Sequence, residues 1–454
     1  MKELLLQTAA RAISYLEGLE NRKVAPDKCA IEKLSLLNTP LPDNPTRPED
    51  VVEKLDEFGS RATMAMAGPR FFGLVIGGSL PAALAANWMV SAWDQNSAFY
   101  NLSPAAALIE QISLNWLLDI LQLPSDSAGA FVTGTTVANF TALAAARHAV
   151  LKKVGWNVEA DGLFGAPSIT VIAGQEAHPT LLKSLGMLGL GRSRIIRIPV
   201  DLQGRMRSDS LPHIEGPTIV CLQAGNVNTG AIDPIDEICD YAHDRGAWVH
   251  IDGAFGLWAR TASTRLFLTK GIEQADSWAT DLHKWLNVPY DSGIAIVKDK
   301  NALRAAMSIT AEYLPSESEN RNPSDYTPEL SRRARGVDVW AAMLSLGRSG
   351  LADLIERTCR HARRFAEAFS LAGFQILNDV VLNQVLVSFG TAEITNQVIT
   401  ELQEEGTCWC GGTVWQGQTA MRISVSSWKT TDEDVEKSIE AILKIARKYG
   451  GIQP

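Results

Sequence analysis

The chain of 454 residues is long enough for two or three packed units, and its 46% apolar and 20% charged residues are typical of an ordinary soluble enzyme. A net charge of −9 without a dense basic cluster argues against a surface that binds nucleic acid or an anionic membrane. Six cysteines do not suggest a disulfide framework, and Cys408-x-Cys410 is not a zinc spacing, so reduced thiols in a cytoplasmic protein are expected.

The first segment, MKELLLQTAARAISYLEGLENRK, lacks the uninterrupted apolar core and the cleavage site of a signal peptide. Apolar side chains recur at helical spacing at Leu5, Ala9, Ala12, Leu16 and Leu19. This spacing predicts an amphipathic helix that packs on another surface. A proline-rich connector, LNTPLPDNPTRPED, follows it.

The uncharged stretch from Phe71 to Trp93 imitates a membrane span. Two glycines and Pro81 would break a single helix there, and Asn87 would need a hydrogen-bond partner in lipid. We expect a buried helix that starts after Ser79, at a core or at a subunit interface.

From about residue 66 to 335, short apolar runs alternate with helical patterns. The runs are GAFVTG, SITVIAG, RIIRIPV, TIVCLQAG, AWVHIDGAF, ADSWATDLH and GIAIVKD, and helices are expected over Thr136 to Lys153, over Pro179 to Leu188 and in IDEICDYAHDRG. The alternation predicts an α/β domain with a mostly parallel sheet, and the continuous apolar runs fit strands buried on both faces.

A long polar segment, SESENRNPSDYTPELSRR, follows, and loops of that length are either disordered or act as lids. Residues 336–454 then give a long helix, VVLNQVLVSF, a second helix, GGTVWQGQTAMRISVS and a last helix. This order predicts a small C-terminal α+β domain.

Two candidate site segments follow expected strands, where open α/β sheets bind ligands. Gly134, Thr135 and Thr136 lie between a strand and a helix, so N–H groups and hydroxyls could hold an anion there. A plain helix cap by Thr136 is the alternative. His178 precedes Pro179 at a helix start, although a single histidine is more often structural.

Two further segments carry opposite charges. Asp252 ends a strand, and Gly253 and Ala254 leave room for a flat group beside it, although a salt bridge or a helix cap would also explain it. Lys284 lies in the mostly apolar run WATDLHKWLNVPYDSG, where a lysine is seldom found unless its amine is used. One βα unit can bring Lys284 back to the sheet edge that carries Asp252.

The four features together match pyridoxal 5′-phosphate, which has a phosphate, a flat ring, a pyridine nitrogen and an aldehyde that can take a lysine. No zinc or other metal site is expected, because the seven histidines show no HExxH or comparable ligand set. A serine hydrolase is not expected either, because no G-x-S-x-G occurs.

The chain resembles the group II pyridoxal-phosphate-dependent amino-acid decarboxylases, which include the aromatic-L-amino-acid decarboxylases. The motifs that carry the resemblance lie between about Gly68 and Asp434, in the same order as in the family. They are PRFFGLVIGG, NLSPAAALIEQ, VTGTTVAN, HIDGAF, ADSWATDLHKWLNVPYDSG, SRRARGVDVW and MRISVSSW. The resemblance implies the α/β fold of aspartate aminotransferase (fold type I) with a seven-stranded sheet, and a homodimer with active sites at the interface. Residues 1–65 would pack in the dimer, 66–335 would bind the cofactor and 336–454 would form the small domain.

The resemblance also implies roles for single residues. Lys284 would form a Schiff base with the cofactor, and Asp252 would pair with its pyridine nitrogen. His178 would stack on the ring and touch the substrate carboxylate, and Ala254 would pack on the other face. Further contacts are implied to the phosphate from Gly134, Thr135, Thr136, Ser277 and His283, to the cofactor from Asn228, and to the substrate from Phe71 and Phe72.

The family protonates the substrate carbon with a loop tyrosine, and Tyr326 in SDYTPELSRRAR matches its placement, with Tyr313 as second choice. The chain departs from the common pattern at two positions. Val137 stands where many relatives have glutamate, and Asp281 stands where animal aromatic decarboxylases have asparagine. Both departures weaken the transfer of a substrate from those enzymes.

Several reactions are compatible with this set of residues. Decarboxylation of an L-amino acid to an amine leads, and an aldehyde synthase or a carbon–carbon lyase on the same scaffold is the alternative. A transaminase should clamp the substrate carboxylate with an arginine. Arg422 is the candidate for that role, although a structural salt bridge explains it better. A non-catalytic relative that binds only a partner or the cofactor is a further class, which the retention of Lys284, Asp252 and His178 disfavours.

The substrate is weakly indicated. Aromatic residues that could line its pocket, and that could equally serve packing, are Phe71, Phe72, Trp93, Phe99 and Tyr100.

Overall fold

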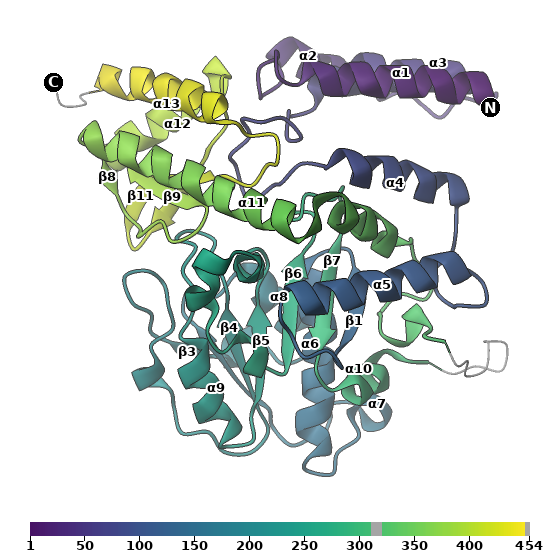
Figure 1. Cartoon of the computed structure of the whole chain (residues 1–454), viewed down its shortest axis with the longest axis vertical. Coiled ribbons are helices and arrows are strands. Elements are labelled where there is room, and N and C mark those ends of the chain that lie inside the picture. Colours follow the sequence, from purple (N-terminus) through teal and green to yellow (C-terminus); the bar gives the residue numbers. More distant parts are fainter. Residues whose placement is uncertain (310–319, 450–454) are drawn as a thin grey trace. The chain divides into compact units, whose positions relative to one another are not determined.

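The computed structural model describes residues 1–309 and 320–449, and its chain divides into two compact units (Figure 1). Unit 1 comprises Met1–Gly78, His361–Leu377 and Val385–Pro454, and unit 2 comprises Ser79–Arg360 and Asn378–Gln384. Both ends of the chain therefore contribute to one unit, whereas the division into domains at residues 65 and 335 stays a sequence-based prediction.

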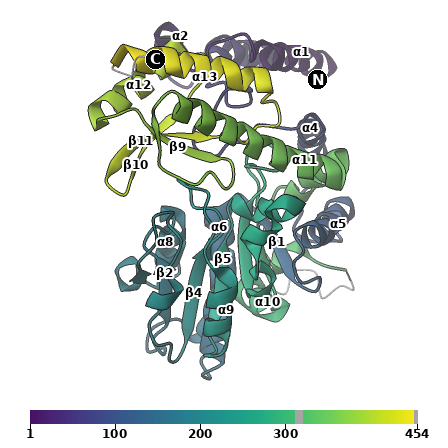
Figure 2. The ribbon, with the colours of Figure 1, turned by 60° about the vertical axis from the view of Figure 1, so that its left-hand side comes forward.

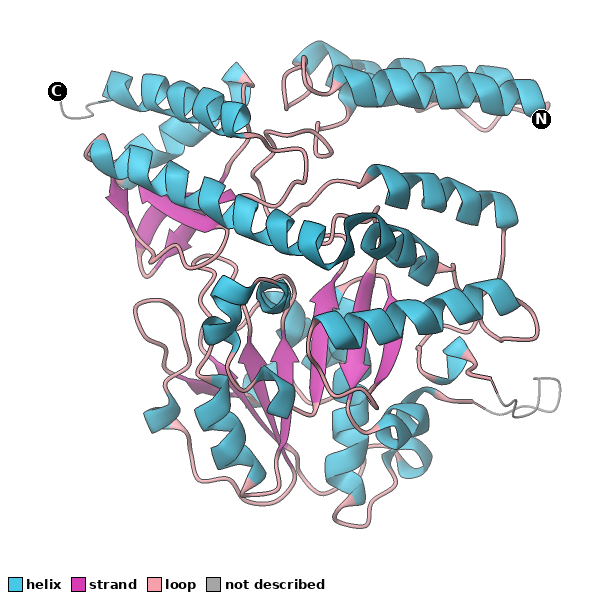
Figure 3. Cartoon of the chain, in the orientation of Figure 1, coloured by secondary structure: helices cyan, strands magenta, loops and turns pink. Residues whose placement is uncertain are grey.

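Unit 2 is built on a seven-stranded sheet with the order β1-β7-β6-β5-β4-β2-β3, drawn in magenta in Figure 3. The strands are β1 (Ala128–Val132), β2 (Thr170–Gly174), β3 (Ile196–Ile198), β4 (Thr218–Gln223), β5 (Trp248–Asp252), β6 (Ser277–Asp281) and β7 (Gly293–Val297). Neighbouring strands are parallel except β7, which is antiparallel to both β1 and β6. The predicted mostly parallel sheet is confirmed, and β1, β4, β5, β6 and β7 are buried along their whole length, as continuous apolar runs require.

The helices of unit 2 are α4 (Pro81–Trp93), α5 (Pro104–Ile120), α6 (Thr135–Lys152), α7 (Val158–Asp161), α8 (Pro179–Met187), α9 (Ile235–His243) and α10 (Lys300–Met307). Helix α6 packs along β1, β4, β5, β6 and β7, and α8 and α10 pack against α6 (Figure 2). Its alanine-rich sequence lets it approach the sheet closely, so the first turn of α6 is held firmly beside the strand ends.

Helix α4 begins soon after Ser79, as predicted, but only Ala83 and Val90 are buried in it. Its Trp88 and Met89 are 43% and 51% exposed, so the predicted helix is only partly buried within this chain. Asn87 has the polar partner that it needs, because its Nδ2 donates to Asp338 Oδ2 at 2.7 Å. Across the described residues, every helix is too short or too polar to span a bilayer.

Unit 1 contains α1 (Lys2–Gly18), α2 (Lys28–Lys33) and α3 (Pro48–Lys54), and a four-stranded sheet with the order β10-β11-β9-β8. The elements of its C-terminal part are β8 (Gln375–Ile376), β9 (Gln384–Ser388), α12 (Ala392–Glu405), β10 (Gly411–Trp415), β11 (Gln418–Ser424) and α13 (Asp432–Ala446). These elements follow the predicted α+β order. The long helix α11 (Arg335–Leu371) connects the units and is interrupted at Gly347, whose φ of 61° suits glycine.

Candidate active site

A cavity of about 400 Å³ opens in unit 2 where the parallel strands end. Its lining comes from segments that follow β1, β4, β5 and β6 and from the start of α8. The structure therefore brings together eight of the predicted site residues: Gly134, Thr135, Thr136, His178, Asp252, Ala254, His283 and Lys284. Ligands bind at this edge of open α/β sheets, so the cavity is the candidate active site.

Lys284 lies just beyond β6 in the cavity lining, its side chain is 22% exposed, and it pairs with Asp281. The Lys284 Nζ atom is 2.8 Å from Asp281 Oδ2, and Asp281 Oδ1 accepts the N–H of Thr135 at 2.6 Å. Burial would raise the pKa of Asp281, but the charges of Lys284 and of a protonated His283, together with hydrogen bonds from Lys284 and Thr135, lower it overall. Asp281 therefore holds the amine beside the first turn of α6. An acidic residue three positions before Lys284 was the signal for this role in the sequence.

Asp252 is the last residue of β5 and is 3% exposed. Its Oδ2 accepts Asn139 Nδ2–H at 2.9 Å, and its Oδ1 accepts the N–H of Ala254 at 3.2 Å. Burial raises the pKa of this carboxyl, while His178, the Asn139 hydrogen bond and Lys284 oppose the rise. A cationic group in the cavity would add to that opposition and stabilise the carboxylate.

The first turn of α6 has the chemistry of an anion site. Thr135 Oγ1 is buried and has no hydrogen-bond partner in the part of the chain that the structure describes. His283 Nδ1 accepts the N–H of Ser292 at 3.1 Å, so its proton lies on Nε2, which can donate. A Cβ on Gly134 would lie 3.1 Å from both Asp281 Oδ1 and His283 Cε1, so glycine leaves space here that a side chain would narrow. These groups fit a phosphate.

His178 caps the start of α8 with its ring. Nδ1 accepts the N–H of Thr180 at 3.3 Å and lies 2.7 Å from Thr180 Oγ1. A ring nitrogen that accepts cannot carry the proton, so the neutral ring carries it on Nε2. Thr180 was not singled out in the sequence, where only its place two residues after His178 could have indicated this contact.

Two predicted cofactor contacts are not in the cavity lining. Ser277 begins β6, at the opposite end of the strand from Asp281, and its Oγ is 2.9 Å from His250 Nδ1. Asn228 follows the lining residue Val227, and its N–H donates to Asn226 Oδ1 at 2.9 Å. Their roles in cofactor binding stay predictions from the resemblance.

The predicted substrate residues Phe71 and Phe72 belong to unit 1 and are 3% and 1% exposed within the chain. Phe71 stacks on Trp409, with ring centroids 5.0 Å apart. Their contact with a substrate stays a prediction.

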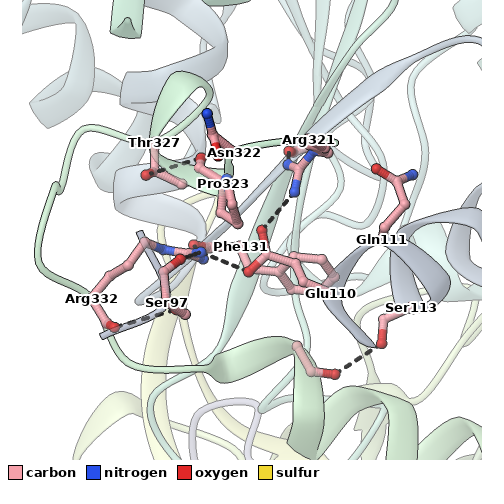
Figure 4. A network of polar contacts seen from close by, with 12 residues as sticks. Ser97, Glu110, Gln111, Ser113, Phe131, Arg321, Asn322, Pro323, Thr327 and Arg332 are labelled. Atoms are coloured by element: carbon pink, nitrogen blue, oxygen red, sulfur yellow. Dashed lines mark hydrogen bonds and ion pairs between the residues drawn. The ribbon is translucent and has the colours of Figure 1, made fainter. Parts of the chain in front are cut away.

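The proton-donor candidate Tyr326 follows a short turn and packs against the core beside α6. The guanidinium of Arg321 lies over its ring, 4.5 Å from the centroid, and Arg321 also pairs with Glu110 at 2.9 Å (Figure 4). Tyr326 is not part of the cavity lining, and its role stays a prediction. Tyr313, the second choice, lies outside the described residues.

Tyr290 is a tyrosine of the cavity lining that the sequence did not single out. It stacks on His283 with ring centroids 4.2 Å apart and is 57% exposed. This stacking steadies the imidazole of His283, whose Nε2 lies 3.6 Å from Asp281 Oδ1. Within the described residues, no group of three His, Cys, Asp or Glu side chains is arranged to hold a metal ion.

Comparison with known families and proteins gives a consistent result. The model of the pyridoxal-dependent decarboxylase conserved domain matches residues 31–391. An aromatic-L-amino-acid decarboxylase from Bacillus atrophaeus is 25% identical over 99% of this chain and 96% of its own length. An L-2,4-diaminobutyrate decarboxylase from Rhizobium meliloti is 31% identical over 81% of this chain and 75% of its own length.

Solved structures share the fold. Oryza sativa TDC, crystallised with PLP and tryptamine, superposes with a TM-score of 0.90 at 23% identity, covering 99% of this chain and 98% of its own. Rhodiola rosea 4-hydroxyphenylacetaldehyde synthase gives 0.86 at 22% identity over 99% and 98% of the two chains. The expected α/β fold is confirmed.

Proposed function

Because the chain belongs to the family of pyridoxal-dependent decarboxylases, we propose that the residues around Lys284 bind pyridoxal 5′-phosphate and an L-amino acid in the cavity of unit 2. Family membership confirms the resemblance that the sequence motifs indicated, and with it a pyridoxal-phosphate-dependent amino-acid carboxy-lyase. The observation that carries the assignment of residues is the convergence of Lys284, Asp252, His178 and the first turn of α6 on one sheet edge.

Each side of the cavity would hold one part of the cofactor. Lys284 would bond to the aldehyde carbon, and Asp252 would face the pyridine nitrogen and keep a proton on it. The first turn of α6 would hold the phosphate through Gly134, Thr135 and Thr136, with His283 donating from Nε2. A phosphate contact from Ser277, whose Oγ is engaged by His250 and Trp248, stays a prediction from the resemblance.

The bound cofactor supplies an electron sink for the electron pair of the breaking bond between Cα and the carboxylate. Lys284 would give up its place to the substrate amine, and the 2.8 Å ion pair with Asp281 would keep the released amine beside the site. His178 would stack on one ring face and donate from Nε2 to the substrate carboxylate, while Ala254 leaves room at the other face. CO₂ would leave, and a proton would be added to Cα.

The proton donor that we propose is Tyr326, as the placement of its motif before the arginine-rich segment indicates. A tyrosine donor together with His178 favours an amine product over an aldehyde. One structural relative is an aldehyde synthase, so the aldehyde outcome is the second candidate function.

The proposed substrate class is an aromatic L-amino acid, supported by the aromatic-L-amino-acid decarboxylase relative. The diaminobutyrate decarboxylase relative keeps a diamino acid as the alternative. The test is to incubate the holoenzyme with the twenty common amino acids, dopa and diaminobutyrate, and to measure CO₂. Release of CO₂ from one aromatic substrate with the matching amine is expected. Release of ammonia and peroxide would instead establish an aldehyde synthase, and CO₂ from diaminobutyrate alone would overturn the aromatic assignment.

We also propose that the enzyme is a homodimer. Helix α1 buries none of its residues within the chain, and its apolar side chains Leu5 and Leu6 are each 57% exposed. Unpartnered apolar side chains on a 17-residue helix favour a second subunit as their partner.

In sedimentation, the wild-type chain is expected to be a dimer, and Leu5→Glu/Leu6→Glu is expected to dissociate because a charge would enter the interface. Phe164→Glu is the matched control, since Phe164 is 97% exposed outside α1. A dimer that persists in the double variant would show that α1 is not the interface.

A reducing compartment such as the cytoplasm fits the six cysteines, all of which are free and five of which are buried.

A further inference from the structure

Four buried side chains form a continuous hydrogen-bonded chain that ends on Asp252. Trp248 Nε1 and His250 Nδ1 each lie 2.9 Å from Ser277 Oγ. His250 Nε2 lies 2.9 Å from Asn139 Oδ1, and Asn139 Nδ2 lies 2.9 Å from Asp252 Oδ2. Trp248 is 5% exposed and the other three are fully buried, so water does not compete for these groups.

The two ends of the chain fix the direction of every hydrogen bond in it. An indole N–H can only donate, and an ionised carboxylate can only accept. Asn139 must therefore donate to Asp252 and accept from His250 Nε2–H. Burial lowers the pKa of His250 to about 3, so the ring is neutral and its Nδ1 must accept from the Ser277 hydroxyl. That hydroxyl in turn accepts from Trp248.

The opposite direction is unfavourable. If Asp252 were protonated and donated to Asn139, the amide would turn and His250 would donate from Nδ1 to Ser277. Ser277 Oγ would then receive two donors, and its own proton would lose its acceptor in a buried position. An unpaired buried donor is costly, so the chain favours the ionised form of Asp252.

We propose that Trp248, Ser277, His250 and Asn139 act as positioning residues, which as one directed chain keep Asp252 ionised and oriented toward the cofactor site. The proposal rests on the proposed function in one respect, namely that Asp252 faces the cofactor. The pKa of Asp252 is also lowered by His178 when its ring is protonated and by Lys284. Burial and the charge of Asp252 raise the pKa of Cys221. None of these replaces the donor that Asn139 supplies.

The first test reads the direction of the chain in the cofactor-free wild-type protein. In a sample labelled with ¹⁵N-histidine, His250 is expected to show a protonated Nε2 and an unprotonated Nδ1 at neutral pH. The signal is assigned by its loss in His250→Gln. A proton on Nδ1 would overturn the proposal, and this result does not depend on cofactor binding.

The second test measures the dissociation constant of pyridoxal 5′-phosphate by absorbance across pH. His250→Phe leaves the Asn139 amide free to turn, so the affinity is expected to fall roughly ten- to a hundredfold. The loss is expected to grow as pH falls, and to begin at a higher pH than in the wild type, because the pKa of Asp252 rises without its donor. His250→Gln can still donate to Asn139 and is expected to restore most of the affinity.

His148→Phe is the matched control, since His148 is also a buried histidine of unit 2 but pairs with Glu159 outside the cavity. Wild-type affinity in His250→Phe, or an equal loss in His148→Phe, would contradict the proposal. A wild-type chain that binds no cofactor would instead refute the proposed function, while the tautomer measurement would still decide the direction of the chain.

Discussion

Replacing Lys284 by alanine is expected to abolish the absorbance band of the lysine-bound cofactor and nearly all decarboxylase activity. Lys284 is the lysine of the cavity lining, and its Nζ is held 2.8 Å from Asp281. Alanine offers no amine to bond the aldehyde or to release the product. We expect kcat to fall by about a thousandfold or more, the scale of loss when a group that acts at the reacting atoms is removed. Absorbance scans and CO₂ release measure the two effects.

The matched control is Lys298→Ala, because Lys298 is an exposed lysine just beyond β7. It should keep both the band and the activity. Borohydride reduction of the wild type should attach the cofactor to the peptide that contains Lys284. Activity that survives in Lys284→Ala, or a label on another lysine, would refute the assignment. Circular dichroism of the variant separates loss of the amine from loss of the fold.

The strand ends explain why much of this site could be predicted from the sequence. Asp252 and the loop at Gly134 directly follow apolar runs that became buried strands, and parallel strands end at one sheet edge. The helix at Thr135 starts one residue before its predicted start. Local patterns therefore located the residues that depend on chain direction alone.

Contacts that depend on side-chain geometry were harder to predict from the sequence. Ser277 and Asp281 stand at the two ends of β6, and a strand of this length separates its ends by roughly 13 Å. The sequence alone does not say which end meets the cavity side chains. The phosphate contact of Ser277 was implied by the resemblance and stays a prediction, and Asp281 was noted only as a departure. Likewise, His250 and Asn139 lie far apart in the sequence, and only the packing of α6 on β5 brings them to 2.9 Å.

The partners of the arginines in the segment SRRAR could not be predicted from the sequence and are shown by the structure. Arg332 is fully buried and donates to Glu110 on α5 at 2.6 Å, while Arg321 donates to the other oxygen of Glu110 at 2.9 Å (Figure 4). Arg332 also donates to the carbonyl groups of Ser97 and Phe131 at 3.2 and 2.9 Å. The network thus fastens the segment that carries Tyr326 to β1 and α5.

Arg332→Met is therefore expected to lower the free energy of unfolding by about 3–5 kcal/mol, the cost of removing one partner of a buried ion pair. Glu110 would keep only Arg321, and two buried carbonyl groups would lose their donor. Urea unfolding measures the change. The control is Arg348→Met, because Arg348 pairs with Asp119 at the surface, where both side chains are at least 60% exposed. Exposed pairs contribute about 1 kcal/mol or less, so equal losses in the two variants would show that burial does not set the strength of this network.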